Sequence, residues 1–300
     1  MPDSKRFLHP EAIKRIARLE LRARHAVEGF LSGMHHSPYF GQSVEFLQHR
    51  EYTRGDDLRD VDWKVWAKQD RYYVKQHEEE TNLRCTLLCD VSGSMRYGNG
   101  AMNKYEYGCT IAACLAYLLL KQQDAVGCVA FDESVRITVP TRTKRNHLDS
   151  IVRALDASAP SKKTEMYQIL RNVTESYPRR GLMILVSDLL VDRPGLFRGL
   201  KLLRSRGHDV MVFHVMDDDE LDFPFTGPTR FEGMEIPDHL RCNPRALREG
   251  YLSALAGYLE EVRRGCVRHG VDYALLRTSQ PLDAALAAYL CNRLGRHHKN

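Results

Sequence analysis

Five oxygen-bearing side chains, far apart in the sequence, have the chemistry to bind a hard metal ion together. Asp90, Ser92 and Ser94 alternate in DVSGS, directly after the apolar segment LRCTLLC. Thr164 stands before a predicted helix, and Asp188 follows the apolar segment LMILVS. Carboxylates and hydroxyls, without His or Cys, favour Mg²⁺ or Mn²⁺ over zinc. Because three of these ligands are neutral, the cation would keep enough positive charge to attract a partner's carboxylate.

The predicted secondary structure explains how such distant residues can meet. Apolar segments predict strands over 83–89, 125–131, 134–139, 181–189, 208–216 and 271–276. Helical patterns fall between them, over 104–122, 146–156, 165–176, 195–205, 245–268 and 281–293, and one more precedes them over 10–31. This alternation predicts an α/β fold, a doubly wound and mainly parallel sheet with helices on both faces. Strand ends and helix starts then share one edge, where ligands bind. The stretch 217–244 is predicted to be irregular.

The joint pattern is more specific than any of its residues. Asp and Ser after a strand commonly form turns, and Thr164 alone would be explained as a helix cap. Together, DVSGSM, the later threonine and the strand-end aspartate resemble the metal-ion-dependent adhesion site of von Willebrand factor A-like domains. The resemblance implies that Asp90, Ser92 and Ser94 are ligands from a first loop, Thr164 from a second and Asp188 from a third.

A segment dense in charged and aromatic residues, 43–82, precedes the predicted α/β domain. Arginines alternate there with acids, and both tryptophans of the chain follow them. Acid–base catalysis and nucleic-acid binding are two interpretations of such a segment. We favour a structural one, in which arginine–carboxylate pairs and buried tryptophans attach an irregular segment to the α/β core. The predicted domains are therefore 1–82, an N-terminal helix with a charged, aromatic, partly β subdomain, and 83–300, the α/β domain.

The same segment resembles a second family, the domain of unknown function 58 proteins. The shared string R-x-Y-x-x-G-D-D-x-R-x-[IV]-D-W is present as Arg50, Tyr52, Gly55, Asp56, Asp57, Arg59, Asp62 and Trp63. The resemblance extends over about residues 25 to 292 and includes an A-like domain after the string. It implies an adaptor or co-chaperone that works with a MoxR-type AAA+ ATPase, or with its client, in the assembly of a protein complex. It assigns no reaction, so the protein is predicted not to be an enzyme.

Composition narrows the remaining possibilities. The longest apolar run, Ile111 to Leu120, is too short to cross a bilayer, and the N-terminus has no apolar signal segment. Eight scattered cysteines without a C-x-x-C pair favour buried free thiols over zinc or disulfides. We therefore predict a cytoplasmic protein without membrane insertion.

Two alternative functions remain open on the sequence. One is a Mg²⁺-dependent phosphoesterase that uses Asp90 as its nucleophile, although DVSGSM has no acid two positions after that residue. The other is nucleic-acid binding, which would rest on a net charge of +5 and on basic chain ends. We expect no nucleic-acid partner, because 39 acidic residues nearly balance 44 basic ones.

Overall fold

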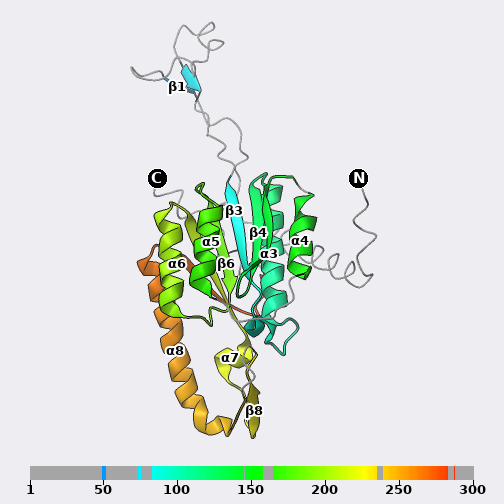
Figure 1. The fold of residues 1–300 in the computed structure, drawn as a ribbon, viewed down its shortest axis with the longest axis vertical. Helices are drawn as coiled ribbons and strands as arrows, with labels where there is room; N and C mark the ends of the chain where they lie inside the picture. The colour runs from blue at the N-terminus through cyan, green and yellow to red at the C-terminus, as the bar shows by residue number, and fades with distance from the viewer. Residues whose placement is uncertain are drawn as a thin grey trace, which may run out of the picture. The chain divides into compact units, whose positions relative to one another are not determined.

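The fold is described from a computed structural model of the 300-residue chain. It describes residues 49–51, 73–75, 83–144, 146–157, 165–234, 239–282 and 287. The chain divides into two compact units, Leu31–Asn82 and a larger one made of Met1–Phe30 with Leu83–Asn300 (Figure 1). Within the smaller unit, strands β1 (His49–Glu51) and β2 (Tyr73–Lys75) form an antiparallel pair. The domain boundary predicted at residue 82 stays a prediction.

The larger unit contains a six-stranded sheet in the order β10-β7-β6-β3-β4-β5. All neighbouring strands are parallel except β4 and β5. The strands are β3 (Arg84–Asp90), β4 (Ala125–Phe131), β5 (Val135–Arg142), β6 (Leu182–Ser187), β7 (Asp209–Met216) and β10 (Asp272–Arg277). The central strands β4 and β6 are almost entirely apolar and buried because both of their faces are covered. The mainly parallel α/β fold predicted from the sequence is confirmed.

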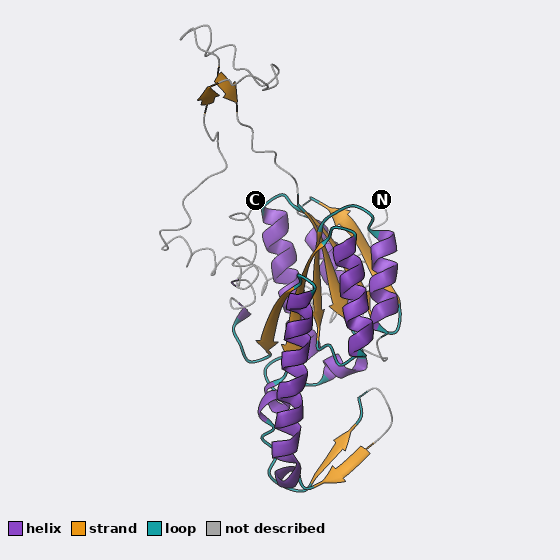
Figure 2. Ribbon diagram, turned by 90° about the vertical axis from the view of Figure 1, so that its left-hand side faces the viewer, coloured by secondary structure: helices purple, strands orange, loops and turns teal. Residues whose placement is uncertain are grey.

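Five helices cover the sheet (Figures 1 and 2). They are α3 (Lys104–Lys121), α4 (His147–Ala157), α5 (Met166–Ser176), α6 (Arg193–Ser205) and α8 (Pro244–Arg268). Leu170 of α5, Leu200 of α6 and Val262 of α8 pack with Leu88 and Leu185 on one face of the sheet. Helix α3 covers the other face, where its Gly108 lies close to Val186. Each of these helices begins within a few residues of its predicted start.

The prediction that 217–244 is irregular is wrong. Residues Asp218–Asp222 form helix α7, and Thr229–Glu232 (β8) pairs antiparallel with His239–Cys242 (β9). Asp217 and Glu220 form a reciprocal capping box, which stabilises a helix too short to form alone. Alternation of half-buried and exposed residues in β8 is typical of a hairpin with one packed face.

Several predictions lie outside the described residues. They include the helix over 10–31, all but three positions of the helix over 281–293, Thr164, and every residue of the R-x-Y-x-x-G-D-D string except Arg50. Arg50 lies in β1 opposite Val74. Within the described ranges, none of the helices combines the length and the apolar character that crossing a membrane would require.

Candidate metal site

Two strand ends at the centre of the sheet bring four of the five predicted ligands to one edge. Strands β3 and β6 are parallel neighbours, and Cys89 pairs with Val186. The residues that follow, Asp90 and Ser187, therefore leave the sheet side by side. The Ser187 hydroxyl donates a hydrogen bond to Asp90 Oδ2 over 2.5 Å. Asp188 comes next in the chain, so the carboxylates of both predicted acidic ligands lie at this edge.

The loop after β3 turns both of its serines into the site. The backbone N–H of Ser92 donates to Asp90 Oδ1 over 2.8 Å, which closes a tight turn. A 3₁₀ helix, η3 (Gly93–Arg96), follows directly and points Ser94 back toward Ser92. The two hydroxyl oxygens lie 3.1 Å apart, and both side chains are buried. Alternating positions in a turn thus become neighbouring ligands in space.

This spacing fits the cation that the residue types favour. Adjacent ligands of an octahedral Mg²⁺ with bonds of about 2.1 Å lie about 3.0 Å from each other. The 3.1 Å between the oxygens of Ser92 and Ser94 matches that separation. Among the described residues, no group of three or more His, Cys, Asp or Glu side chains offers an alternative metal site. The oxygen set that includes the serines is therefore the candidate metal site.

The Asp90 carboxylate is buried near a second negative charge, which a cation would offset. Its side chain is only 3% exposed. Burial, and then the negative charge of Asp188, raise the pKa of Asp90 to about 7, although hydrogen bonds from Ser187 and Ser92 oppose the shift. A divalent cation between the two carboxylates would favour their ionised forms.

A buried lysine already neutralises part of this charge. Lys104, the first residue of α3, is fully buried, and its ammonium lies 2.8 Å from Asp188 Oδ2 and 2.7 Å from Glu220 Oε1. Burial lowers the pKa of Lys104, but the two carboxylates together outweigh it and leave the pKa above its ordinary value. The ammonium therefore stays charged and links the site to α7.

The backbone carbonyl of Asp188 also takes part in a hydrogen bond. Its carbonyl oxygen accepts a hydrogen bond from His214 Nε2 over 2.8 Å. Because that carbonyl can only accept, the neutral ring carries its proton on Nε2, and Nδ1 accepts from the Tyr273 hydroxyl over 2.8 Å. Burial lowers the pKa of His214 to about 4, so the ring stays neutral. Tyr273 and His214 thus hold the backbone of Asp188 through a chain of two hydrogen bonds.

Sequence reasoning missed Lys104, Glu220 and Ser187. One signal for Lys104 was available: a cation in the first turn of a helix faces the positive end of the helix dipole and is unfavourable there without a partner. A lysine at the start of a helix that begins at the ligand edge therefore indicates a tertiary acid partner. For Ser187 and Glu220 the local sequence holds no such signal.

The predicted buried thiols are confirmed where the structure describes them. Six of the seven described cysteines are buried, and all seven are free. Burial raises the pKa of Cys114 and Cys266 to about 12, so these thiols are not nucleophiles.

Several proteins and solved structures are similar to this chain. Uncharacterized proteins Mb1516 of Mycobacterium bovis and Rv1480 of Mycobacterium tuberculosis are each 25% identical over 289 residues, which cover 95% of this chain and 90% of theirs. Among solved structures, conserved hypothetical protein BatB from Bacteroides thetaiotaomicron is similar at 14% identity, 71% and 99% coverage and a TM-score of 0.46. The VWA domain of SpRpn10 is similar at 11% identity, 69% and 94% coverage and a TM-score of 0.40.

The match to a family model is more specific. Residues 48–259 match the model described as protein of unknown function DUF58. This range runs from the start of the R-x-Y-x-x-G-D-D string, through β3 and the candidate ligands, into α8. The chain belongs to the DUF58 family.

Proposed function

We propose that this protein is a metal-dependent binding module that holds a carboxylate of a protein partner at the edge of its sheet. Asp90, Ser92, Ser94 and Asp188 would hold Mg²⁺ or Mn²⁺, and Thr164 completes the set predicted from the sequence. Bound there, the cation would supply a Lewis-acidic position at which the partner's Asp or Glu replaces water. The observation that carries the proposal is the 3.1 Å separation of the Ser92 and Ser94 hydroxyls beside two buried carboxylates.

The charges of the site favour an acidic partner. The Asp90 and Asp188 carboxylates bring two negative charges, and Lys104 offsets one of them through its contact with Asp188. Because Glu220 shares the same ammonium, a divalent cation and the lysine together would neutralise the three carboxylates. An open position on that cation, beside the neutral serine hydroxyls, would still accept an anionic ligand. Electrostatic attraction is strong in such a buried, poorly hydrated place, so a partner's carboxylate would be favoured over water.

The partner we propose first is a MoxR-type AAA+ ATPase, or the client on which it acts, because the family resemblance implies an adaptor or co-chaperone. The module itself would carry out no reaction. Its role would be to bring two proteins together, with the metal as the bridge.

The experiment is affinity capture of a purified MoxR-type ATPase from the same genome by the full-length chain, once in excess Mg²⁺ and once in EDTA. We expect capture by the wild type only in Mg²⁺, and no capture by Ser92→Ala/Ser94→Ala. The matched control is Ser205→Ala, which removes a hydroxyl at the exposed end of α6. Equal capture by all variants in both buffers would contradict the proposal.

One observation keeps the phosphoesterase alternative testable. Phosphoryl transfer needs a cation for the phosphate, and Lys104 places one beside Asp188. Its ammonium is fully buried and engaged by two carboxylates, so it acts as a countercharge within the fold. Hydrolysis of para-nitrophenyl phosphate that disappears in Asp90→Asn would favour the enzyme; we expect no hydrolysis by either protein.

A further inference from the structure

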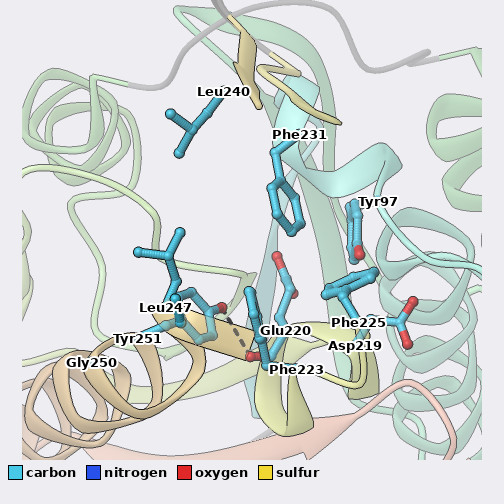
Figure 3. Close-up of a pocket in the computed structure, with 11 residues that line it drawn as sticks. Tyr97, Asp219, Glu220, Phe223, Phe225, Phe231, Leu240, Leu247, Gly250 and Tyr251 are labelled. Atoms are coloured by element: carbon cyan, nitrogen blue, oxygen red, sulfur yellow. Dashed lines mark hydrogen bonds between the residues drawn. The ribbon is translucent and has the colours of Figure 1, made fainter. Parts of the chain in front are cut away.

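A large apolar groove lies next to the candidate metal site. It has a volume of about 510 Å³ and is formed by α7, the β8–β9 hairpin and the first turns of α8 (Figure 3). Its apolar wall consists of Phe223, Phe225, Phe231, Leu240, Leu247 and Tyr251. Phe223 packs against the rings of Phe225, Phe231 and Tyr251, with ring centroids 4.6 to 5.8 Å apart. The wall is therefore a connected aromatic cluster that keeps its shape without a ligand.

This wall is not an ordinary part of the core, because its rim is exposed. Leu240 is 59% exposed and Leu247 is 43% exposed. In the first eighteen residues of α8, through Glu261, only Pro244 is buried. Figures 1 and 2 show the N-terminal turns of the helix running with the hairpin beyond the edge of the sheet. A concave apolar surface with exposed leucines at its rim is typical of a binding site.

The groove and the candidate metal site are connected through the ion pairs of one lysine. Glu220 lines the groove, and its carboxylate contacts the same Lys104 ammonium that contacts Asp188. The Tyr251 hydroxyl donates to the Glu220 carbonyl over 2.9 Å, which fixes α7 against α8 (Figure 3). A single lysine head group therefore links the candidate metal site to the wall of the groove.

The charged residues that line the groove determine whether it favours a positive or a negative ligand. Asp219 and Glu220 are the charged side chains that line it, and both are acidic. Lys104 offsets part of the charge of Glu220, whereas Asp219 accepts a hydrogen bond from neutral Asn99 and forms no ion pair with any described residue. Burial, and then the charge of Asp219, raise the pKa of Tyr97 on the same wall. This end of the groove is thus negative and aromatic, an arrangement that favours a cation.

We propose that this groove binds a segment of the partner protein through a bulky apolar side chain and an adjacent arginine or lysine. The apolar side chain fills the aromatic wall, and the cation lies at Asp219. The inference rests on the proposed function only in taking the ligand to be a protein segment. It adds a second recognition element, independent of metal, to the carboxylate that the metal site would bind.

The test is selection of random 12-residue peptides, displayed on phage, against the immobilised full-length chain. We expect peptides selected in EDTA to share a bulky apolar residue with Arg or Lys within a few positions. Selection in Mg²⁺ should add an Asp or Glu to that motif. If the apolar–basic motif appears but Mg²⁺ adds no Asp or Glu to it, the metal-bridge function is contradicted and the groove proposal is supported. Failure of the proposed function and failure of the groove proposal therefore give different results.

Two glycines of α8 provide a matched pair of variants. Gly250 lines the groove, Gly257 lies two turns further along the same helix, and a side chain at either position meets open space. Gly250→Trp fills the groove and should weaken binding of a synthetic selected peptide at least tenfold, whereas Gly257→Trp should bind it as the wild type does. Neither change should destabilise the fold, because each replaces a helical glycine. Unchanged binding by Gly250→Trp, or selected peptides without a shared apolar–basic pair, would overturn the proposal.

Discussion

The Lys104 ammonium lies 2.8 Å from Asp188 Oδ2 with neither side chain more than 1% exposed, so an internal cation contacts one of the two carboxylates proposed to bind a metal. The lysine has two effects on that site. It offsets the buried negative charge of Asp188 when no metal is present, and it reduces the negative charge available to a cation. Stability without metal and affinity for metal therefore depend on this contact in opposite directions.

Removing the lysine charge should separate these two effects. Lys104→Met keeps most of the side-chain volume but leaves Asp188 and Glu220 buried without their countercharge. Breaking such a buried pair costs about 3–5 kcal/mol, so we expect a loss of that order in the free energy of unfolding, measured by urea denaturation in EDTA. Saturating Mg²⁺ should restore part of the loss, because the cation replaces the missing charge.

The matched control for this prediction is Lys121→Met. Lys121 ends the same helix at an exposed position, where a cation interacts favourably with the helix dipole by about 0.3–1 kcal/mol. We expect a small loss of stability from this variant, equal in EDTA and in Mg²⁺. A Lys104→Met protein as stable as the wild type in EDTA would contradict the role of the buried pair.

Ser187 should position Asp90 for the metal. Its hydroxyl donates to Asp90 Oδ2 and accepts from the Leu189 backbone N–H over 2.9 Å. Ser187→Ala removes both bonds, so we expect the free energy of unfolding to fall by about 1–3 kcal/mol. We also expect Mg²⁺ affinity to weaken about tenfold, as is typical when a group behind a metal ligand is removed. Isothermal titration calorimetry measures the affinity; an unchanged value would assign Ser187 a purely structural role.

Bound metal should stabilise the folded protein. Because the ligand set comes from separate strands of the sheet, the unfolded chain has no preformed site, and Mg²⁺ binds the folded state alone. At a concentration of 100 times the dissociation constant this linkage is worth about 2.7 kcal/mol. We expect the thermal midpoint to rise with Mg²⁺ for the wild type and to stay constant for Asp90→Asn. A rise of the same size in both proteins would point to a different cation site.

His208 should make the protein less stable in mild acid. The ring is fully buried, and burial lowers its pKa below the ordinary 6.5. As the pH falls below 6.5, the unfolded chain binds a proton that the folded protein does not, so the free energy of unfolding decreases by up to about 1.4 kcal/mol per pH unit. His208→Asn should show a shallower decrease between pH 6.5 and 5, whatever its stability at neutral pH. Identical slopes for the two proteins would contradict this assignment.

Much of the fold follows from local patterns. Strands such as AVGCVAF are apolar at every position because the sheet is covered on both faces, and this pattern locates the strand from sequence alone. Helix α8 begins with the cap and proline of CNPRAL, so its start lies within one residue of the predicted one. In the candidate site, the spacing of Asp90, Ser92 and Ser94 on one loop brings them together through short-range geometry.

Other features depend on contacts that local sequence does not contain. Lys104 contacts Asp188, 84 residues away, and Glu220, 116 residues away, so its role follows only from the tertiary fold. The β8–β9 hairpin was predicted to be irregular because its strands are short and polar. Its stability comes from stacking of Phe231, in β8, on Phe223, which directly follows α7, at a centroid distance of 5.8 Å.

The measurement that tests the central claim most directly is a titration of the EDTA-treated full-length chain with Mn²⁺, followed by electron paramagnetic resonance of the free ion. We predict one bound Mn²⁺ per wild-type chain, displaced by excess Mg²⁺, and none in Ser92→Ala/Ser94→Ala. Circular dichroism of the variant should match the wild type, because each Ser→Ala change removes one oxygen and keeps the Cβ atom and the loop backbone in place. Equal Mn²⁺ binding by the two proteins, or none by the wild type, would contradict a metal site at the edge of this sheet.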